Sequence, residues 1–457
     1  MNIIILGAGQ VGSSLAEALV SEANDITLID QSEESLRLLA DRLDVRTVVG
    51  NGALPSVLKS AGIRSADLLI AVTHSDQNNL VACKIACQQF AVPARIARLR
   101  SADFLDEELL SERNFAVDFA LCPEQEISDY IAKLIEYPEA LQVVEFAEGR
   151  LTLVGVRAHA GGLLVGQPIR AMRDHLPAGV DARIAAIFRE TRPIEPDGDT
   201  LVQEGDEVFL LAASEHIRVV LQELRSVQGP VRNVLIAGGG NIGARVAQRL
   251  ENECRVKLVE RDAERAAAVA AQLERTLVLA GEATDENLLI QQGIGETDMF
   301  LALTNDDEDN IMAASLAKRL GCQRVLALIN RRAYAEMVEG GPIDIGLSPA
   351  QISIGSLLTH IRQAEVARIH RLRRGAAEAV ELVVKGDRRN SRVVGRRIEE
   401  LPRIPGAHIC AVLRGPAVII PHHDTLIESG DHVVVFCTRK RQIAAVEKLF
   451  QARSGLF

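Results

Sequence analysis

The chain has 457 residues and is acidic, with 62 Asp and Glu against 51 Lys and Arg and a net charge of −11. The length predicts about three domains. The negative balance argues against a nucleic-acid partner and against direct docking on anionic lipid, because both surfaces attract clustered Lys and Arg. No run approaches about 20 consecutive apolar residues, so no transmembrane helix and no direct membrane insertion are expected.

The chain start and the cysteines both favour a cytoplasmic protein. Met1 and Asn2 run straight into apolar residues 3–6, so no secretory leader is expected. The 7 cysteines are dispersed, which fits a reducing compartment better than a disulfide framework. Cys83 and Cys87 could share a helix face, but further metal ligands are not evident nearby. We favour two buried small side chains over a metal or redox pair.

Residues 1–138 alternate short apolar runs with helical patterns, which predicts an α/β domain with a doubly wound parallel sheet. Two runs, IIIL at 3–6 and DLLIAV at 67–72, are nearly unbroken apolar, as in strands covered on both faces. Strands are expected at 2–6, 26–30, 45–49, 67–72, 94–98 and 117–121, and helices at about 11–22, 32–42, 53–60, 77–90 and 103–113.

The following segment, residues 139–228, has a different texture. Its apolar runs are strand-like, and residues rich in Gly, Pro and Asp separate them. This pattern predicts a small β-rich α+β module that ends in a helix at about 215–226. The expected strands cover 143–147, 151–156, 182–189 and 207–213.

The whole pattern returns at an offset of 231 residues. Segment 4–12 matches 235–243, and segment 69–73 matches 300–304. Asp76 and Asn79 match Asp307 and Asn310 at the same offset. The chain is therefore a tandem duplication, because one offset over this length is hard to obtain by chance. The predicted domains are two Rossmann-like domains, 1–138 and 229–363, and two β-rich modules, 139–228 and 364–457.

A glycine motif follows the first expected strand and opens the first helix. Gly7-x-Gly9-x-x-Gly12 in this context is the dinucleotide fingerprint, in which backbone N–H groups at a helix start meet phosphates. Asp30 ends the second strand, where its carboxylate can accept hydrogen bonds from both ribose hydroxyls and would repel a 2′-phosphate. The motif favours NAD(H) or an adenine nucleotide over NADP(H), the alternative being an empty Rossmann-like turn.

The second half repeats this motif. Gly238, Gly240 and Gly243 match the first triplet, and Glu260 ends the corresponding second strand. Retention of both features in both halves favours two nucleotide sites. A degenerate second site kept for packing is the alternative.

Further candidate ligands follow the other strands, because ligands of such sheets bind beyond the carboxyl ends of the strands. Asn51 and Gly52 follow the third strand, and Thr73 and His74 follow the fourth. The hydroxyl and backbone N–H of Thr73 are placed to reach a ribose or a diphosphate. The complete set of candidate nucleotide-binding residues is Gly7, Ala8, Gly9, Gln10, Val11, Gly12, Asp30, Asn51, Gly52, Thr73, His74, Arg98, Gly238, Gly239, Gly240, Asn241, Ile242, Gly243, Glu260 and Thr304.

The two halves differ at the fifth strand. Arg98 ends that strand in the first half, where a guanidinium can neutralise phosphate oxygens; a surface salt bridge is the alternative. With a one-residue shift, Leu328 takes this place in the second half. The second site is therefore expected to handle phosphates differently.

No catalytic or metal-ligating residue is expected. The β-rich modules repeat no His, Cys or Lys in a plausible catalytic setting, and the sequence PHHD at 421–424 places neighbouring side chains on opposite faces of a strand. Two ligand sites on duplicated domains favour a ligand-biased conformational switch. An NAD-dependent oxidoreductase is the alternative, but it would need a general acid or base beside the nicotinamide.

The segments GAGQVG at 7–12, GNG at 50–52 and VTHSDQNN at 72–79, with Asp30, resemble the regulatory RCK (or KTN) domain. Two such units, each with a C-terminal companion, are similar to the regulatory subunits of bacterial Trk potassium-uptake systems. The resemblance implies a homo-tetramer whose eight RCK units form a ring under an integral-membrane, TrkH/TrkG-like potassium transporter. It also implies that NAD(H), with ATP or ADP as further ligands, changes the shape of the ring and so the gate.

The resemblance also places the protein at the cytoplasmic face of the inner membrane through its transporter. It carries over as nucleotide contacts Gly7, Gly9, Gly12, Asp30, Thr73 and Arg98. Leu328 and residues 282–283 depart from the pattern in the second half.

Helices are also expected after the sixth strand of each half, from 122 to about 135 and from about 347 onward. Pro123 and Pro349 near the first turn suit a helix start. Such helices either cross to a neighbouring unit or pack on their own domain, and the sequence leaves both open.

Overall fold

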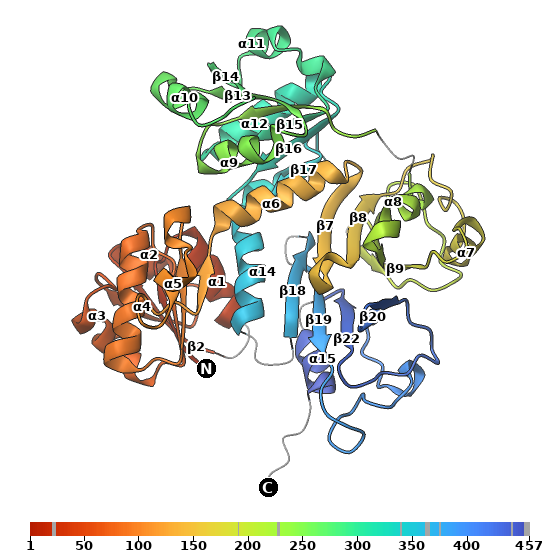
Figure 1. The fold of residues 1–457 in the computed structure, drawn as a ribbon, viewed down its shortest axis with the longest axis horizontal. Coiled ribbons are helices and arrows are strands. Elements are labelled where there is room, and N and C mark those ends of the chain that lie inside the picture. The colour runs from red at the N-terminus through yellow and green to blue at the C-terminus, as the bar shows by residue number, and fades with distance from the viewer. Residues whose placement is uncertain are drawn as a thin grey trace. The chain divides into compact units, whose positions relative to one another are not determined.

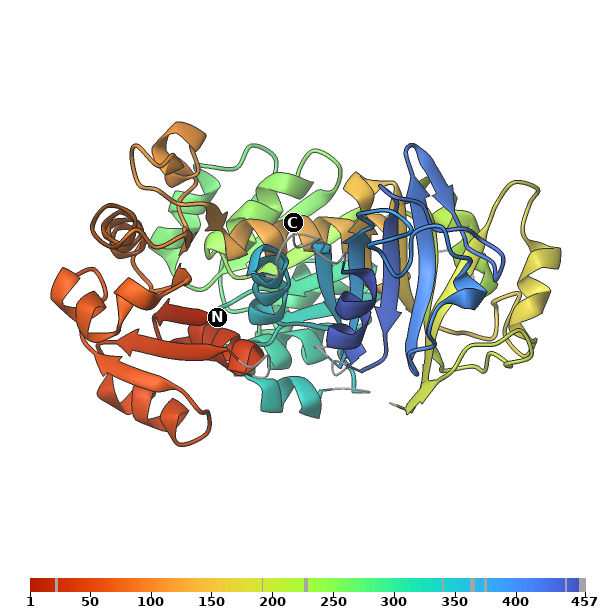
Figure 2. The same ribbon diagram turned by 90° about the horizontal axis from the view of Figure 1, so that it is seen from below.

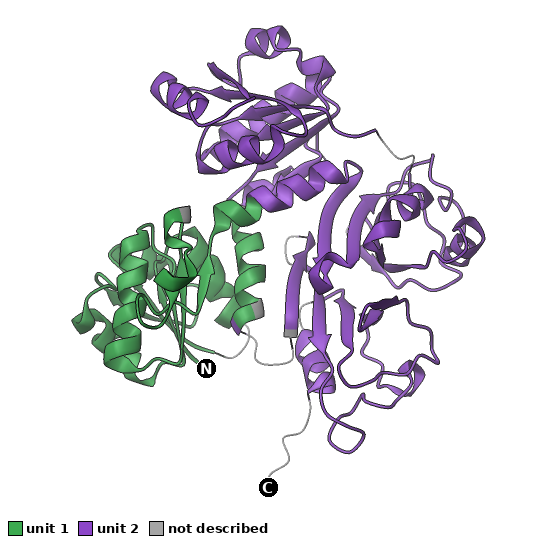
Figure 3. Cartoon of the chain, in the orientation of Figure 1, with its two compact units in different colours: residues 1–127, 348–360 green, residues 128–347, 361–457 purple. Residues whose placement is uncertain are grey.

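The computed structural model describes residues 1–20, 24–190, 192–225, 229–338, 341–361, 366–373, 376–439 and 442–451. The chain forms two compact units: residues 1–127 with 348–360, and residues 128–347 with 361–457 (Figure 3). No helix within the described ranges is long and apolar enough to cross a membrane.

Unit 1 is built on a six-stranded parallel sheet with helices along it (Figure 1). Its strands are β1 (Asn2–Leu6), β2 (Asp25–Asp30), β3 (Arg46–Val49), β4 (Leu68–Ala71), β5 (Ala94–Arg98) and β6 (Phe119–Leu121). Its helices are α1 (Gln10–Val20), α2 (Glu33–Ala40), α3 (Pro55–Ser60), α4 (Asp76–Phe90), α5 (Glu107–Leu110), the start of α6 (Pro123–Glu136), and α14 (Pro349–Ile361) except its last residue. The strand order β3-β2-β1-β4-β5-β6 is that of a dinucleotide-binding sheet.

Apolar sequence explains the centre of this sheet. All four residues of β4 are buried, and so are four of the five in β1, as expected for strands with both faces covered. The helix α4 begins where the Ser75 side chain accepts a hydrogen bond from the backbone N–H of Asn78 at 3.2 Å. It ends at Ala91, which takes a left-handed conformation with φ of 51°.

The helix expected at 103–113 is wrong as a continuous element. The structure has a 3-10 turn over Ala102–Phe104 and the separate short helix α5. Asp106 starts α5 by accepting a hydrogen bond from the N–H of Leu109 at 3.0 Å, and Ser111, with φ of −54° and ψ of 158°, already lies outside the helical region. Local capping therefore divides the apolar pattern into two turns. The end of the helix expected at 11–22 lies outside the described residues.

The helix α14 belongs to unit 1 although its sequence follows the last strand of the second half. At its end the ring of His360 stacks on Phe119 of β6, with ring centroids 3.6 Å apart. In turn α6 starts in unit 1 and continues from residue 128 in unit 2. For α14 the grouping agrees with a helix that crosses to the other half, whereas α6 is divided between the two units.

Unit 2 contains a second parallel sheet with the same order, β14-β13-β12-β15-β16-β17. Its strands are β12 (Asn233–Ala237), β13 (Arg255–Glu260), β14 (Leu277–Ala280), β15 (Met299–Ala302), β16 (Arg324–Leu328) and β17 (Ile345–Leu347). Its helices are α9 (Asn241–Leu250), α10 (Ala263–Ala270), α11 (Glu286–Gln291), α12 (Asp307–Arg319) and α13 (Arg332–Met337).

Unit 2 also holds two five-stranded antiparallel sheets. The first module has β7 (Ala140–Phe146), β8 (Leu151–Arg157), β9 (Ala182–Arg189), β10 (Arg192–Ile194), β11 (Glu207–Ala213), α7 (Met172–His175) and α8 (Ile217–Val220). The second has β18 (Val366–Leu372), β19 (Ala377–Val383), β20 (Ala407–Arg414), β21 (Ala417–Ile419), β22 (His432–Cys437) and α15 (Ile443–Phe450). The orders β10-β9-β11-β8-β7 and β21-β20-β22-β19-β18 correspond strand for strand. The predicted fold class is confirmed.

The two antiparallel modules share one hydrophobic core. Strand β7 packs beside β18, and β9 beside β20, as the adjoining strands in Figure 2 also show. The rings of Phe209 and Phe436, one from each module, lie 5.4 Å apart within a cluster of buried residues from both sheets. The Arg183 guanidinium adds a hydrogen bond to the carbonyl of Ile409 at 3.0 Å. Each module therefore buries the apolar face of the other.

Two details of the module predictions need correction. The expected helix at 215–226 is a run of single turns, with α8 between 3-10 turns at Ser214–His216 and Leu221–Glu223, and residue 226 lies outside the described residues. The short strands β10 and β18 were not expected. β18 is an edge strand rich in Arg and His, so its sequence lacks a continuous apolar run.

Candidate nucleotide-binding sites

The first glycine loop joins β1 to α1, and two of its glycines are required by the backbone. Gly7 has φ of 101°, and its N–H donates to the carbonyl of Ile29 at 2.8 Å. A Cβ on Gly12 would lie 1.9 Å from the carbonyl oxygen of Gly7. A Cβ on Gly9 would meet nothing within 4 Å. The loop therefore has one open face, at Gly9, beside the start of α1 at Gln10 and Val11.

The second glycine loop, between β12 and α9, has the same geometry. Gly238 has φ of 105°, a Cβ on Gly243 would lie 1.9 Å from the oxygen of Gly238, and a Cβ on Gly240 would meet nothing. Asn241 and Ile242 form the first turn of α9. The open backbone face, where phosphates bind in such loops, is present in both halves.

Each expected acid lies against its glycine loop. Asp30 accepts a hydrogen bond from the N–H of Ala8 at 2.6 Å and another from Ser32 at 2.8 Å, one on each carboxylate oxygen. Glu260 does the same with Gly239 at 2.7 Å and Asp262 at 2.9 Å. Asp30 and Glu260 are both partly exposed, so each acid fixes its loop and retains lone pairs that can accept further hydrogen bonds.

A buried asparagine joins the ends of β4 and β5. Asn79 is fully buried, and its Oδ1 accepts from the N–H and the hydroxyl of Thr73 at 3.1 and 2.6 Å. Its Nδ2 donates to the carbonyls of Thr73 and Arg98 at 3.2 and 2.9 Å. Both donors of Thr73 are thus engaged, and its hydroxyl oxygen also accepts a hydrogen bond from the N–H of Ser75 at 3.3 Å. The contact of Thr73 with nucleotide stays a prediction.

The second half repeats this arrangement. The Oδ1 of Asn310 accepts from the N–H and hydroxyl of Thr304 at 2.9 and 2.8 Å, and its Nδ2 donates to the carbonyls of Thr304 and Leu328 at 3.0 Å each. Asn79 and Asn310 correspond at the offset of 231 residues, but no role was expected for either. A polar residue repeated in the first turn of a buried helix was the available signal.

Replacement of Asn79 by alanine is expected to destabilise unit 1 by about 2–4 kcal/mol, because buried backbone groups of Thr73 and Arg98 would lose their partners. Chemical denaturation of the full chain checks this value. Asn78→Ala, at the neighbouring position of α4, is the matched control and should change little. A similar effect of both substitutions would contradict the assignment.

The remaining candidates of the first half have local roles. The Oδ1 of Asn51 accepts from the N–H of Ala53 at 2.9 Å and so forms a turn after β3. A Cβ on Gly52 would come within 2.6 Å of the Leu6 side chain, so this glycine permits close packing. His74 is exposed. Their contact with a ligand stays a prediction.

Arg98 is largely buried and lies beside a carboxylate. Its Nη2 lies 3.4 Å from Glu124 Oε1 in the first turn of α6, and its Nε is buried without a hydrogen-bond partner. Burial lowers the pKa of Arg98, and Glu124 opposes that shift. Arg98 therefore does form a salt bridge, with Glu124, but this ion pair is largely buried and does not lie on the surface.

The sheet register supports the correspondence of Arg98 and Leu328. Ala97 pairs with Ala71 in the first sheet as Ala327 pairs with Ala302 in the second, and the next residues are Arg98 and Leu328. Glu124 follows the proline that opens α6, and the residue after the proline of α14 is Ala350. Both members of the charged pair are thus apolar in the second half.

The second half has other cations instead. The Nε of Arg265, on α10, donates to the carbonyl of Gly239 at 2.8 Å, while the residue at this offset in the first half is Glu34. Arg261 directly follows Glu260 and lies 3.8 Å from Asp309. The second half therefore lacks a cation at the end of the fifth strand but has arginines beside its glycine loop and its acid.

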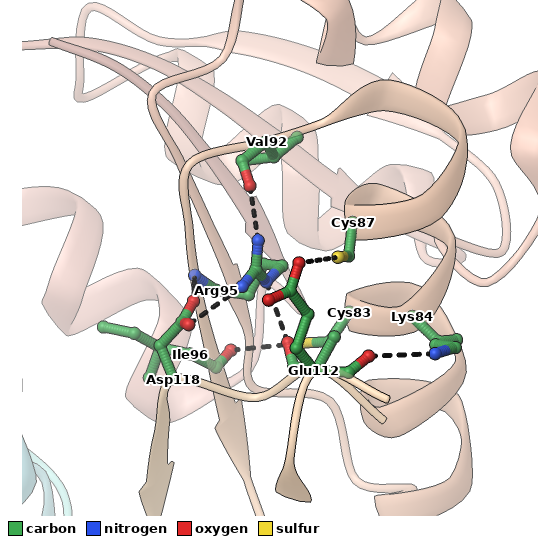
Figure 4. Close-up of polar contacts among 9 residues, drawn as sticks. Cys83, Lys84, Cys87, Val92, Arg95, Ile96, Glu112 and Asp118 are labelled. Carbon is green, nitrogen blue, oxygen red and sulfur yellow. Dashed lines mark hydrogen bonds and ion pairs between the residues drawn. The ribbon is translucent and has the colours of Figure 1, made fainter. Parts of the chain in front are cut away.

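The two cysteines of α4 lie on one face, as their spacing suggested (Figure 4). The Cys83 thiol is fully buried and donates to the carbonyl of Ile96 at 3.8 Å, and burial raises its pKa to about 12. A thiol that stays protonated is a poor metal ligand. Cys87 lies 3.9 Å from Glu112. Across the described ranges, His, Cys, Asp and Glu form no group of three suited to a metal ion.

The residues of both loops fit a nucleotide. Each loop has an open backbone face, at Gly9 or Gly240, beside a carboxylate, Asp30 or Glu260, that accepts a hydrogen bond from the loop. Together with the sheet order, these features define a protein with two Rossmann-type nucleotide-binding domains.

Comparison with known proteins identifies the family. The TrkA-N domain model matches residues 3–123 and 234–349, and the TrkA-C domain model matches 153–225 and 388–451. The Trk system potassium uptake protein TrkA of Vibrio alginolyticus is 49% identical over 453 residues, covering 99% of both chains. That of Halomonas elongata is 50% identical over 458 residues, covering 100% of both. The chain therefore belongs to the TrkA family.

Solved structures agree on the fold. The GsuK channel bound to NAD matches with a TM-score of 0.62 and 18% identity, covering 98% of this chain and 78% of that chain. GsuK bound to ADP matches with a TM-score of 0.50 and 17% identity, covering 79% and 70%. At this identity the similarity concerns the fold alone.

Proposed function

We propose that this protein is the nucleotide-binding regulatory subunit of a Trk-type potassium uptake system. It acts at the cytoplasmic face of the inner membrane on a TrkH/TrkG-like transporter, as a homo-tetramer with a ring of eight RCK units. Full-length similarity to TrkA proteins supports the system, and the paired glycine loops with their acids support the ligand. The role is regulatory and not enzymatic.

The proposed ligand is NAD(H), with ATP or ADP as competitors for the same loops. Backbone N–H groups at the starts of α1 and α9 would hold the phosphates, and Asp30 and Glu260 would hold the adenosine ribose. The nicotinamide supplies redox chemistry in dehydrogenases, but in this proposal the whole ligand acts through binding alone. The acids favour a ligand with a free 2′-hydroxyl and so favour NAD(H) over NADP(H).

The ion pair between Arg98 and Glu124 supports a route from ligand to conformation. Arg98 ends β5, and Glu124 lies in the first turn of α6, which starts in unit 1 and continues in unit 2. A phosphate that binds Arg98 competes with Glu124 for the guanidinium group. It thereby weakens the ion pair that holds the start of α6. The free energy of nucleotide binding is thereby coupled to the conformation of this helix.

Arg98→Leu is expected to weaken nucleotide binding at the first site by about 10- to 150-fold, the scale of a charge-assisted contact. Glu124→Gln is expected to strengthen it, because the guanidinium no longer has a competing carboxylate. Calorimetric titration of the full chain with NADH and with ATP measures both. Equal affinities for wild type and both variants would remove Arg98 from the site.

Membrane recruitment tests the proposed partner. The protein should sediment with membranes that contain its Trk-type transporter and stay in the supernatant with membranes that lack every such transporter. Sedimentation in both cases would contradict the proposal. Steady oxidation of NADH in the presence of a carbonyl substrate, followed at about 340 nm, would instead favour the oxidoreductase.

A further inference from the structure

Unit 2 contains a cavity of about 540 Å³ whose lining includes no residue of either glycine loop. The first antiparallel module contributes Arg157, Arg225 and Glu207, the second parallel domain contributes Lys318, Arg324 and Asp344, and the second module contributes Arg373. Its volume is in the range of cavities that hold small molecules. The wall also includes apolar side chains, among them Leu141, Val338 and Ile343.

The cavity is cationic although the chain as a whole is acidic. Among its lining residues, five Arg and Lys side chains face two carboxylates, a net charge of +3. The two carboxylates are already engaged: Asp344 lies 2.8 Å from Lys318, and Glu207 lies 2.9 Å from Arg373. The other three guanidiniums, of Arg157, Arg225 and Arg324, form no ion pair with a carboxylate within 4 Å in the described part of the chain.

Arg324 is the most unusual of these cations. It is only 8% exposed, its Nη2 donates to the carbonyl of Ala140 at 2.9 Å, and its Nη1 is buried without a hydrogen-bond partner. Arg225 likewise leaves its Nε buried and unpartnered, while its Nη1 lies 3.4 Å from the carbonyl of Glu139. Burial lowers the pKa of Arg324 to about 10, and the neighbouring charge of Arg225 adds to this effect although Asp344 and Glu139 oppose it.

Buried donors without partners are costly, and a charged donor is the costliest. An anion in the cavity would lie beside these guanidinium groups, which match the oxygens of phosphates and carboxylates with paired hydrogen bonds. We propose that this cavity binds a small oxyanion with at least two negative charges, held by Arg157, Arg225 and Arg324. The site is separate from the nucleotide loops and does not depend on the function proposed above.

Calorimetric titration of the full chain with pyrophosphate and with citrate tests the proposal and separates phosphate from carboxylate ligands. At least one probe should bind, and Arg157→Gln and Arg324→Gln should each weaken it about tenfold or more. Arg42→Gln, which removes an equally positive but exposed side chain paired with Glu17, is the matched control and should leave affinity unchanged. Gly9→Ala and Gly240→Ala should also leave it unchanged, which separates this site from the glycine loops.

Arg157 is exposed and its side chain makes no hydrogen bond within the described residues, so Arg157→Gln should fold even if Arg324→Gln does not. In that case the affinity of the Arg157 variant alone tests the proposal. Absence of binding by both probes would overturn the proposal. Equal affinities of wild type and the folded cavity variants, or loss of binding in the glycine-loop variants alone, would overturn it as well.

Discussion

Gly12→Ala is expected to abolish nucleotide binding at the first site and to destabilise unit 1 by about 3 kcal/mol or more. The new methyl group would lie 1.9 Å from the carbonyl oxygen of Gly7, so the turn between β1 and α1 could not keep its shape. Calorimetry should show the number of bound nucleotides per chain fall by half, and thermal unfolding should show the loss of stability.

Gly9→Ala is the matched control for this substitution. Its Cβ meets nothing within 4 Å, so the fold should keep its stability, but the methyl group occupies the open face where phosphates are expected. Nucleotide affinity at the first site should therefore fall at least tenfold with no change in unfolding temperature. Unchanged affinity in the Gly9 variant would show that the ligand does not use this face.

Asp30→Ala is expected to weaken NAD(H) binding at the first site by about 1–3 kcal/mol, the range of charge-assisted hydrogen bonds. The carboxylate would be lost both as a ribose acceptor and as the acceptor from the N–H of Ala8, now at 2.6 Å. Asp30→Asn keeps one carbonyl oxygen but removes the charge, so it should lose less affinity for NAD(H).

The same pair of variants tests the choice between cofactors. Because the negative charge of Asp30 repels a 2′-phosphate, Asp30→Asn should narrow the preference for NAD(H) over NADP(H). Parallel titrations with both cofactors measure this ratio. A ratio equal to that of wild type, with unchanged NAD(H) affinity, would remove Asp30 from the site.

The sequence predicted those features that depend on local pattern. Nearly unbroken apolar runs located the central strands, and a fixed offset of 231 residues disclosed the duplication. The glycine loops and their acids were found because a tight turn, a helix start and a strand end each require a particular residue type at a particular spacing. Their positions against one another, as in the hydrogen bond of Asp30 to Ala8, follow from the strand order.

Features that depend on tertiary packing were not predictable from one sequence. The hydrogen-bond partners of Asn79 could not be predicted, because Thr73 and Arg98 come together only when β4 and β5 pair. The ion pair of Arg98 with Glu124 joins residues 26 positions apart. The helix expected at 103–113 is a local error instead. The apolar pattern was interpreted as one continuous helix, although Asp106 starts a new turn.

The shared core of the two antiparallel modules was also beyond reach of the pattern. The pattern predicts a separate set of apolar strands for each module. It does not predict that Phe209 of the first module lies against Phe436 of the second. The cationic cavity arises in the same way, because Arg157, Arg324 and Arg373 come from three different domains.

Potassium flux through the transporter tests the central claim most directly. Proteoliposomes that contain a Trk-type transporter are loaded with the wild-type chain or with its Gly9→Ala, Gly240→Ala double variant, and potassium uptake is measured with and without NADH or ATP. The account predicts that nucleotide changes the flux with the wild-type chain and has little effect with the variant. A flux that responds equally to nucleotide with the variant, or that is independent of the chain altogether, would contradict it.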